Sequence, residues 1–184
     1  ISSTDDPAMI SKDGIALYSY DDKELHTPKP KTPEQALAMA KEYFGEWMPA
    51  ASGMLETATF SRQQGRLKDA AFLTHQAAER LYHCVLLVCT FYTPHVHNLA
   101  FLRTQAERID MRLVDAWPRE RREDRALFEK LKEAYVKARY SKHYRISQEE
   151  LFRLNENVAA LGQAVHAVCL DRILELEARV PTSK

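Results

Sequence analysis

Apolar residues recur at steps of three and four along most of this chain, which is the spacing of one face of an α-helix. The clearest stretch is 68–91, where no Gly or Pro interrupts the pattern and the apolar positions form two adjoining stripes. From Val85 to Cys89 the chain is apolar on every side, so this half of the helix is expected to be buried all round. A third stripe is polar in its middle and consists of Phe72, His75, Gln76, Glu79, His83 and Leu86. We therefore expect a central helix whose polar stripe meets a partner elsewhere in the chain.

Two helical segments are expected before the central helix. Thr32 is followed by proline and, three residues on, by Gln35, which is the pattern of a capping box. Pro49 is expected to stop or kink this first helix, because proline removes a backbone donor and clashes with the preceding turn. A second segment is expected over about 50–64, and Gly65 is its stop signal.

Three further segments are expected after the central helix. Asn98 is a suitable cap for a helix over about 98–109, and a Trp-Pro dipeptide separates that helix from the next one. The next helix begins near Glu123, and Arg139 falls on the edge of its apolar face. Ser147 and Glu150 form a second capping box before a last helix of roughly 30 residues, about 45 Å long. Such a length suits the spine of a bundle or an interface between two copies.

The first 31 residues follow a different pattern. Ile15–Tyr20 has the composition of a short strand that could return near Leu25, and Thr27–Lys31 has the composition of an extended linker. An isolated hairpin is marginal in water, so we expect this one to belong to a sheet outside the sequence. The first residue is Ile instead of Met, which we interpret as the mark of a processed or partial chain. We expect a tail, strand remnant and linker over 1–31 and a helical domain over 32–180.

Composition favours an all-α fold. The 184 residues include five Gly and eight Pro, fewer turn residues than a strand-rich chain needs. Three Cys, none spaced as CxxC, provide neither a disulfide framework nor a zinc knuckle, so we expect reduced core thiols in a cytoplasmic protein. No apolar run approaches the roughly 20 residues that span a bilayer, and we expect no membrane partner.

A metal site is not expected. His75, Glu79 and His83 share one helical face, but the two histidines are about 12 Å apart along the axis, too far for one ion. His95 and His97 lie in a turn, where capping and turn chemistry are the expected roles. The sequence has no GxSxG and no glycine-rich phosphate loop, which argues against the common hydrolase and nucleotide-loop enzymes. We expect no cofactor.

A basic segment is the stronger candidate for chemistry. The net charge of the chain is zero, but no acid occurs from Ala134 to Gln148. The cations there are Lys137, Arg139, Lys142 and Arg145, with His143 among them. Arginine offers a permanent cation to phosphate and histidine exchanges protons near neutral pH, as metal-free RNA cleavage requires. The alternative is a solvated helix end, where the helix dipole favours cations.

Three stretches together resemble one family. The runs AAFLTHQAAERLYHCVLLV, HNLAFL and AYVKARYSKHYRIS are similar to the HEPN domain (higher eukaryotes and prokaryotes nucleotide-binding), particularly the version that follows a minimal nucleotidyltransferase domain in one bacterial chain. The resemblance covers roughly 32–173. It implies an all-α helical bundle, usually a homodimer, whose central-helix polar residues face the Arg-containing motif. It also implies that the N-terminal strand closes a nucleotidyltransferase domain.

The resemblance implies roles for particular residues. Many HEPN proteins are metal-independent ribonucleases whose motif is Arg, four to six residues, then His, whereas three residues separate Arg139 from His143 here. We therefore expect phosphate binding in place of cleavage. The expected nucleotide- or phosphate-binding residues are Glu79, Gln76, Arg139, Lys142, His143, Arg145, Tyr140 and Tyr144. In related toxin and antitoxin pairs a Tyr near the motif histidine is nucleotidylated by the partner enzyme, a role that Tyr140 or Tyr144 fits.

Three functions stay open. The leading one is a nucleotide- or RNA-phosphate-binding and dimerisation module that serves an attached or neighbouring nucleotidyltransferase. The second is a metal-independent endoribonuclease, the toxin of a toxin–antitoxin pair, with Arg139 and His143 as catalytic residues. The third is a structural dimerisation domain.

We also predict a hydrogen-bonded pair between Glu79 and Arg139, completed by Gln76 or His75 and a nearby tyrosine. The reason is that each charge needs a partner once it is partly desolvated.

Overall fold

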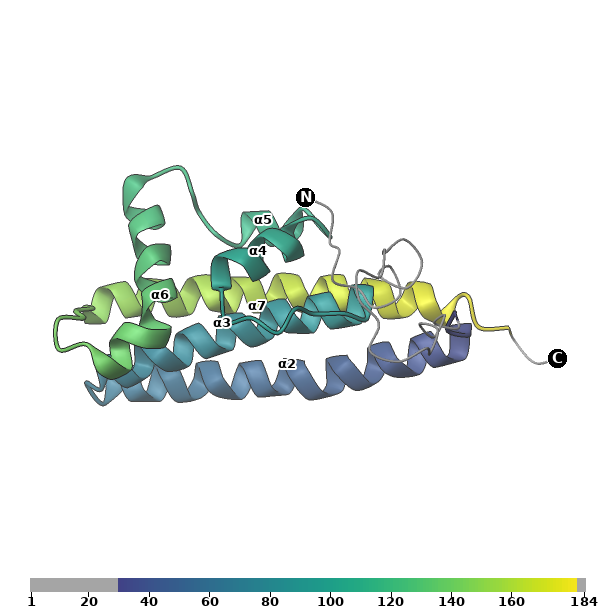
Figure 1. Cartoon of the computed structure of the whole chain (residues 1–184), viewed down its shortest axis with the longest axis horizontal. Helices are drawn as coiled ribbons and strands as arrows, with labels where there is room; N and C mark the ends of the chain where they lie inside the picture. Colours follow the sequence, from purple (N-terminus) through teal and green to yellow (C-terminus); the bar gives the residue numbers. More distant parts are fainter. Residues whose placement is uncertain (1–29, 182–184) are drawn as a thin grey trace, which may run out of the picture.

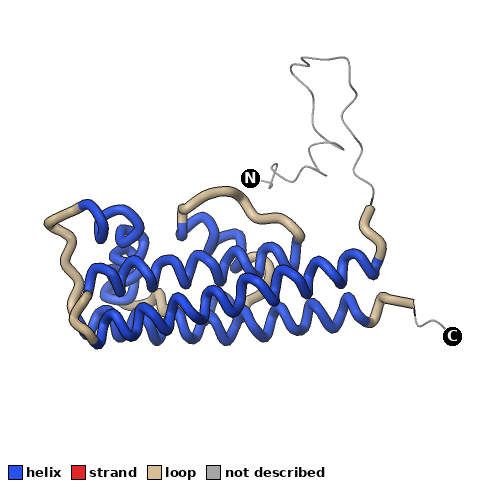
Figure 2. The backbone as a smooth tube through the Cα atoms, turned by 90° about the horizontal axis from the view of Figure 1, so that it is seen from below, coloured by secondary structure: helices blue, strands red, loops and turns tan. Residues whose placement is uncertain are grey.

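Six helices make up the part of the chain that the computed structural model describes, residues 30–181. They are α2 (Pro33–Gln63), α3 (Leu67–Thr90), α4 (Leu99–Glu107), α5 (Arg112–Asp115), α6 (Arg122–Tyr140) and α7 (Gln148–Glu177). The long helices α2, α3 and α7 lie side by side, α4 and α5 lie along one side of them, and α6 stands steeply inclined at one end (Figure 1). Helices and loops, without a strand, account for all the described residues (Figure 2), which confirms the predicted all-α bundle. The hairpin predicted near 15–25 lies outside this range.

One continuous helix takes the place of the two segments predicted before the central helix. Its capping box is confirmed, because the Gln35 amide donates to the Thr32 side chain and the Thr32 amide donates to the Gln35 side chain. The predicted stop at Pro49 is wrong, since this proline lies inside α2. Proline removes one hydrogen bond, but Ala51 and Ala58 on the same helix are at most 1% exposed. The packing of α2 against α3 and α7 therefore outweighs the local signal.

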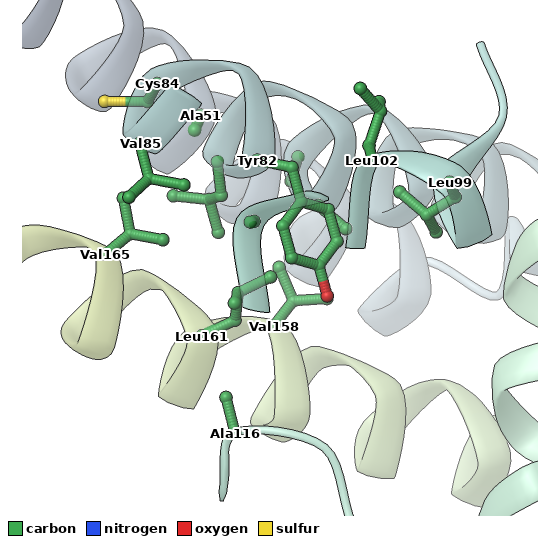
Figure 3. Packing of buried hydrophobic residues seen from close by; sticks show 14 of the residues in the cluster. Ala51, Tyr82, Cys84, Val85, Leu99, Leu102, Ala116, Val158, Leu161 and Val165 are labelled. Carbon is green, nitrogen blue, oxygen red and sulfur yellow. The ribbon is translucent and has the colours of Figure 1, made fainter. Parts of the chain in front are cut away.

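The central helix is confirmed as α3. It ends at Thr90 and is capped by Phe91, which has a φ of 60° and donates its amide hydrogen to the Leu87 carbonyl. The all-round burial predicted for Val85 to Cys89 is confirmed from Val85 to Val88, whereas Cys89 is only partly buried. Figure 3 shows Tyr82 of this helix reaching toward Val158 of α7 in the bundle interior. The polar stripe of α3 is consequently held in a rigid, closely packed element.

A buried amide connects the three long helices. Asn155 of α7 is 6% exposed, and its side chain hydrogen-bonds to the hydroxyls of Thr74 in α3 at 2.9 Å and Thr59 in α2 at 3.0 Å. Apolar contacts alone tolerate sliding of one helix along another, whereas a shift here would leave a buried amide unpaired. This network therefore fixes the relative register of the helices.

Two side-chain contacts bring the turns at one end of the bundle together. The Lys68 ammonium at the start of α3 donates to the Ser141 carbonyl at 2.7 Å, and the Gln148 amide of α7 donates to the Arg62 carbonyl at 2.9 Å. The predicted Ser147 capping box is present at the start of α7. The basic segment after α6 thus lies next to the turn between α2 and α3.

Candidate functional site

The polar stripe of α3 is organised around Glu79. This carboxylate is 6% exposed, with Oε2 3.3 Å from Nε2 of His75 and Oε1 3.2 Å from Nδ1 of His97. His75 lies one turn earlier on α3, and His97 belongs to the connection between α3 and α4. We call Glu79, His75 and His97 together the Glu79 hub.

Both ring nitrogens of His75 have hydrogen-bond partners. Nδ1 of His75 is 2.9 Å from the Leu131 carbonyl of α6, and its other nitrogen faces the Glu79 carboxylate. Both of these partners are hydrogen-bond acceptors, so the ring is held from two sides, by α6 and by the next turn of α3. His75 is 1% exposed. The imidazole and the carboxylate are therefore buried together inside the bundle, and each depends on the other as a polar partner.

The Glu79 pKa reflects two opposing effects. Burial raises the pKa of this carboxyl, but the hydrogen bonds from His75 and His97 and the charge of the two rings together outweigh burial. The net result is a pKa below the ordinary value of 4.5. Glu79 is thus an anion at neutral pH and favours donors on both of its neighbours.

The ring of Tyr135 in α6 lies between the hub and the basic end of the helix. The His97 ring stacks on it, with centroids 4.9 Å apart and planes at 17°, and the His75 ring lies 5.3 Å away. On the α3 side the ring of Phe72 is 6.3 Å away. Tyr135 is therefore surrounded by aromatic neighbours from α3 and from the α3–α4 connection.

The Arg139 guanidinium rests on this aromatic group. Its carbon is 4.6 Å from the Phe72 ring centroid, 4.8 Å from that of Tyr135 and 5.1 Å from that of Tyr140. Its Nε–H donates to the Tyr135 carbonyl at 2.9 Å. The residue is exposed, and its two terminal nitrogens have no hydrogen-bond partner among residues 30–181. The cation is thus fixed in orientation while its outer edge faces solvent.

The predicted pair between Glu79 and Arg139 is wrong. Within residues 30–181 the ion-pair partners of Glu79 are His75 and His97, and no bond joins it to Arg139. Both carboxylate oxygens already have imidazole partners, and the guanidinium is stabilised by rings and by a carbonyl of its own helix. Arg139 is also exposed, so it lies outside the buried face whose edge it was predicted to occupy. The hub and Arg139 share Tyr135 in place of a direct contact.

The loop after α6 presents further cations. Lys142, His143 and Arg145 are exposed, and the Arg145 guanidinium donates to the carbonyls of Lys142 at 2.6 Å and Tyr144 at 3.2 Å. The His143 backbone amide donates to the Ser141 hydroxyl, but its ring has no hydrogen-bond partner within the described range. These side chains form an open basic surface next to Arg139 and provide no oriented acid–base pair.

The two candidate tyrosines differ in access. Tyr144 is 5% exposed, its hydroxyl donates to the Lys130 carbonyl at 3.0 Å, and burial raises its pKa. Tyr140 is 76% exposed. Only the Tyr140 hydroxyl is therefore open to a ligand or to a modifying enzyme.

Gln76 does not join the hub. Its side-chain nitrogen Nε2 is buried and has no hydrogen-bond partner in the described part of the chain. His83 is separate too, because its Nδ1 pairs with the Thr93 hydroxyl at 2.6 Å and its ring packs on Trp47. The predicted polar stripe consequently divides into a hub around Glu79 and a separate histidine further along α3.

Sequence reasoning missed three residues of this site. His97 was assigned to turn chemistry, Tyr135 was assigned to an apolar face, and Phe72 was placed at the apolar end of the polar stripe without a role in the site. The His97 contact crosses 18 residues of chain, so no helical spacing reports it. For Phe72 and Tyr135 the available signal was that both share a helical face with a predicted site residue.

Two other kinds of site are not found among residues 30–181. No group of three or more His, Cys, Asp or Glu side chains there is arranged to hold a metal ion. None of the helices in that range combines the length and the apolarity needed to cross a membrane.

Comparison with models of known protein families gives a match. The family model described as HEPN domain matches residues 44–166, a range that contains every residue of the hub, Arg139 and the basic loop. No curated protein matches the chain.

Proposed function

This chain belongs to the HEPN domain family, and from that premise we propose that it is a nucleotide- or RNA-phosphate-binding module whose main phosphate contact is Arg139. The observation that carries the proposal is the exposed guanidinium held by three rings and a carbonyl. Because the guanidinium is already held in one orientation before a ligand binds, less conformational entropy is lost on binding. The planar edge of the guanidinium can donate hydrogen bonds to two phosphate oxygens at once.

Neighbouring cations support the same proposal. Lys142, His143 and Arg145 follow Arg139 on the exposed loop, and Lys68 is tied to that loop through Ser141. A phosphate chain that contacts Arg139 therefore finds further positive charge along the loop. The exposed ring of Tyr140 offers a stacking surface for a base, while Glu79 supports the site from within the bundle.

Arg139 variants test this proposal. Arg139→Ala is expected to weaken binding of a labelled RNA oligonucleotide at least about tenfold, because it removes a charged contact and its stacking. Arg139→Lys is expected to recover part of that loss, since lysine keeps the charge but not the planar fork. Fluorescence anisotropy at fixed salt measures both variants, and calorimetry with ATP shows whether a free nucleotide binds.

The matched control is Arg179→Ala, which removes the same charge from an exposed position just after the end of α7. It is expected to leave the affinity near that of the unmodified chain. Equal affinities for the unmodified chain, Arg139→Ala and Arg139→Lys would contradict phosphate binding at Arg139. The chain would then be interpreted as a dimerisation domain alone.

A second candidate function is the metal-independent endoribonuclease. Arg139 and His143 are both exposed at the same end of α6, which is the observation in its favour. A general base, however, is usually oriented by a second group, and none holds the His143 ring. We therefore expect purified protein to cleave RNA little or not at all in EDTA, by gel analysis of a labelled RNA. Strong cleavage that persists in EDTA and is lost in His143→Ala would reverse this preference.

We propose further that the chain is a homodimer, on the basis of its family. The α7 stripe expected to mediate this contact is buried within the single chain, at Leu151, Leu154, Val158, Leu161 and Val165. An open apolar groove of about 760 Å³ between α2 and α7 is the surface that we assign to the second copy. Phe60, 58% exposed, stands at its edge.

Light scattering at micromolar concentration is expected to give twice the 21.2 kDa chain mass. Phe60→Glu is expected to give the single-chain mass, because it places a charge in an apolar contact. The control is Leu174→Glu, an exposed apolar residue of α7 outside the groove. A single-chain mass for the unmodified protein would contradict the homodimer.

A nucleotidyltransferase, attached or neighbouring, is the partner that we propose from the sequence resemblance. The coding sequence upstream of Ile1 tests this partner, because transferase motifs there favour an accessory role and a short separate antitoxin gene favours the toxin. If such an enzyme modifies a tyrosine, the accessible one is Tyr140.

A further inference from the structure

We propose that His97 is a positioning residue for the Arg139 cation. It acts through Tyr135, which contacts both side chains. The proposal rests on the proposed function in one respect, namely that Arg139 is the phosphate contact. The proposal gives the α3–α4 connection a role in phosphate binding, although this connection is distant from the basic loop in sequence.

His97 is oriented although it lies at the surface. Its side chain is 63% exposed, yet Nδ1 is 3.2 Å from the Glu79 carboxylate, which is itself fixed by His75. An exposed histidine without such a bond samples several rotamers. The bond to a buried carboxylate therefore holds the ring in the plane in which it stacks on Tyr135.

The Tyr135 ring needs this support. On the α3 side it has Phe72 and His75 as neighbours, but from the α3–α4 connection the His97 ring is its stacking partner. The Arg139 guanidinium lies 4.8 Å from the same Tyr135 centroid, and its Nε–H is bonded to the Tyr135 carbonyl. Loss of the His97 ring frees Tyr135 to turn toward the vacated space, which changes the surface on which Arg139 rests.

The Nε–H group of Arg139 gives a direct readout that needs no ligand. Its NMR signal is assigned by its disappearance in Arg139→Lys, and its exchange with solvent is slow while the bond to the Tyr135 carbonyl and the ring contacts persist. In His97→Ala we expect this exchange to become severalfold faster. Affinity for the labelled RNA oligonucleotide is expected to fall about three- to fivefold, the loss expected for one stacking contact.

Three variants separate positioning from general damage. His97→Phe keeps a ring against Tyr135 and is expected to restore slow Arg139 exchange more fully than His97→Asn, which keeps only an N–H for Glu79. His95→Ala is the matched control, because His95 is exposed in the same connection and no hydrogen bond or ring contact is found for it among residues 30–181. It is expected to match the unmodified chain in both measurements.

The outcomes distinguish the two proposals. Unchanged Arg139 exchange in His97→Ala would overturn the positioning role, whatever the RNA affinity. If His97→Asn restored slow Arg139 exchange and His97→Phe did not, the proposal that His97 acts by stacking on Tyr135 would be overturned. Faster exchange in His97→Ala, with no RNA binding by any form of the protein, would sustain the positioning of Arg139 and reject phosphate binding.

Discussion

Glu79→Ala is expected to lower the free energy of unfolding by about 3 kcal/mol, the cost of leaving a buried polar group without its partner. The group left without its partner is Nε2 of the His75 ring, which is 1% exposed and still bound through Nδ1 to the Leu131 carbonyl. His97 contributes little to this loss because water reaches it when the carboxylate is gone. Urea denaturation followed by circular dichroism measures the change.

The matched control for Glu79→Ala is Glu133→Ala. Glu133 forms an ion pair with Lys137 on α6, but its side chain is 44% exposed. Pairs of this kind contribute about 0 to 1 kcal/mol. Equal stabilities of the two variants would show that the hub is not a buried ion pair.

The pH dependence of stability provides a second test of the hub. The folded pKa of Glu79 is lower than 4.5, so its contribution to stability is complete above the ordinary carboxyl pKa and disappears as pH falls through the folded value. Glu79→Gln removes the titration while keeping a similar shape. The stability difference between the unmodified chain and Glu79→Gln is therefore expected to shrink below about pH 4.5. A difference that stays constant from pH 7 to pH 3 would contradict an ionised Glu79.

Leu161→Ala is expected to destabilise the fold by about 2 to 5 kcal/mol. Leu161 is 0% exposed and belongs to the α7 layer that includes Val158 and faces Tyr82 of α3 (Figure 3). Alanine leaves a cavity among three rigid helices, and the helices cannot close around it without disturbing the Asn155 network. The loss therefore includes both the transfer free energy of the removed atoms and a cavity term.

Leu174→Ala on the same helix is the control for Leu161→Ala, because Leu174 is 60% exposed. Its effect is expected to stay within about 0.5 kcal/mol. Guanidinium denaturation at one pH measures both variants. A loss below 1 kcal/mol in Leu161→Ala would mean that the α2–α3–α7 interior relaxes freely.

Local signals predicted the helix ends well. The capping boxes at Thr32 and Ser147 and the cap at Asn98 depend on residues three apart, so they can be read from the sequence. Pro49 was misread because its local effect is opposed by the packing of two distant helices. Sequence reasoning is reliable where the partners are neighbours in the chain, and it fails where tertiary packing decides.

The candidate site illustrates the same limit. Glu79 and Arg139 were correctly expected to need partners, but which partners depends on how α3, α6 and the α3–α4 connection meet. His97 reaches Glu79 only because Phe91 ends α3 and the chain turns back along it. The spacing of residues in the sequence does not report that the chain turns back along α3. Charge and burial therefore predicted that Glu79 and Arg139 need partners, but not which residues the partners are.

Because α7 packs against both α2 and α3, the interior of the bundle cannot close until the last helix is made. As the chain leaves the ribosome, α2 and α3 can pair as a hairpin, but the apolar face that α7 covers stays open to water. The hydroxyls of Thr59 and Thr74 also lack their hydrogen-bond partner until Asn155 is synthesised, more than 80 residues after Thr74. The nascent chain therefore passes through a long interval in which chaperones, or other nascent chains, have access to that face.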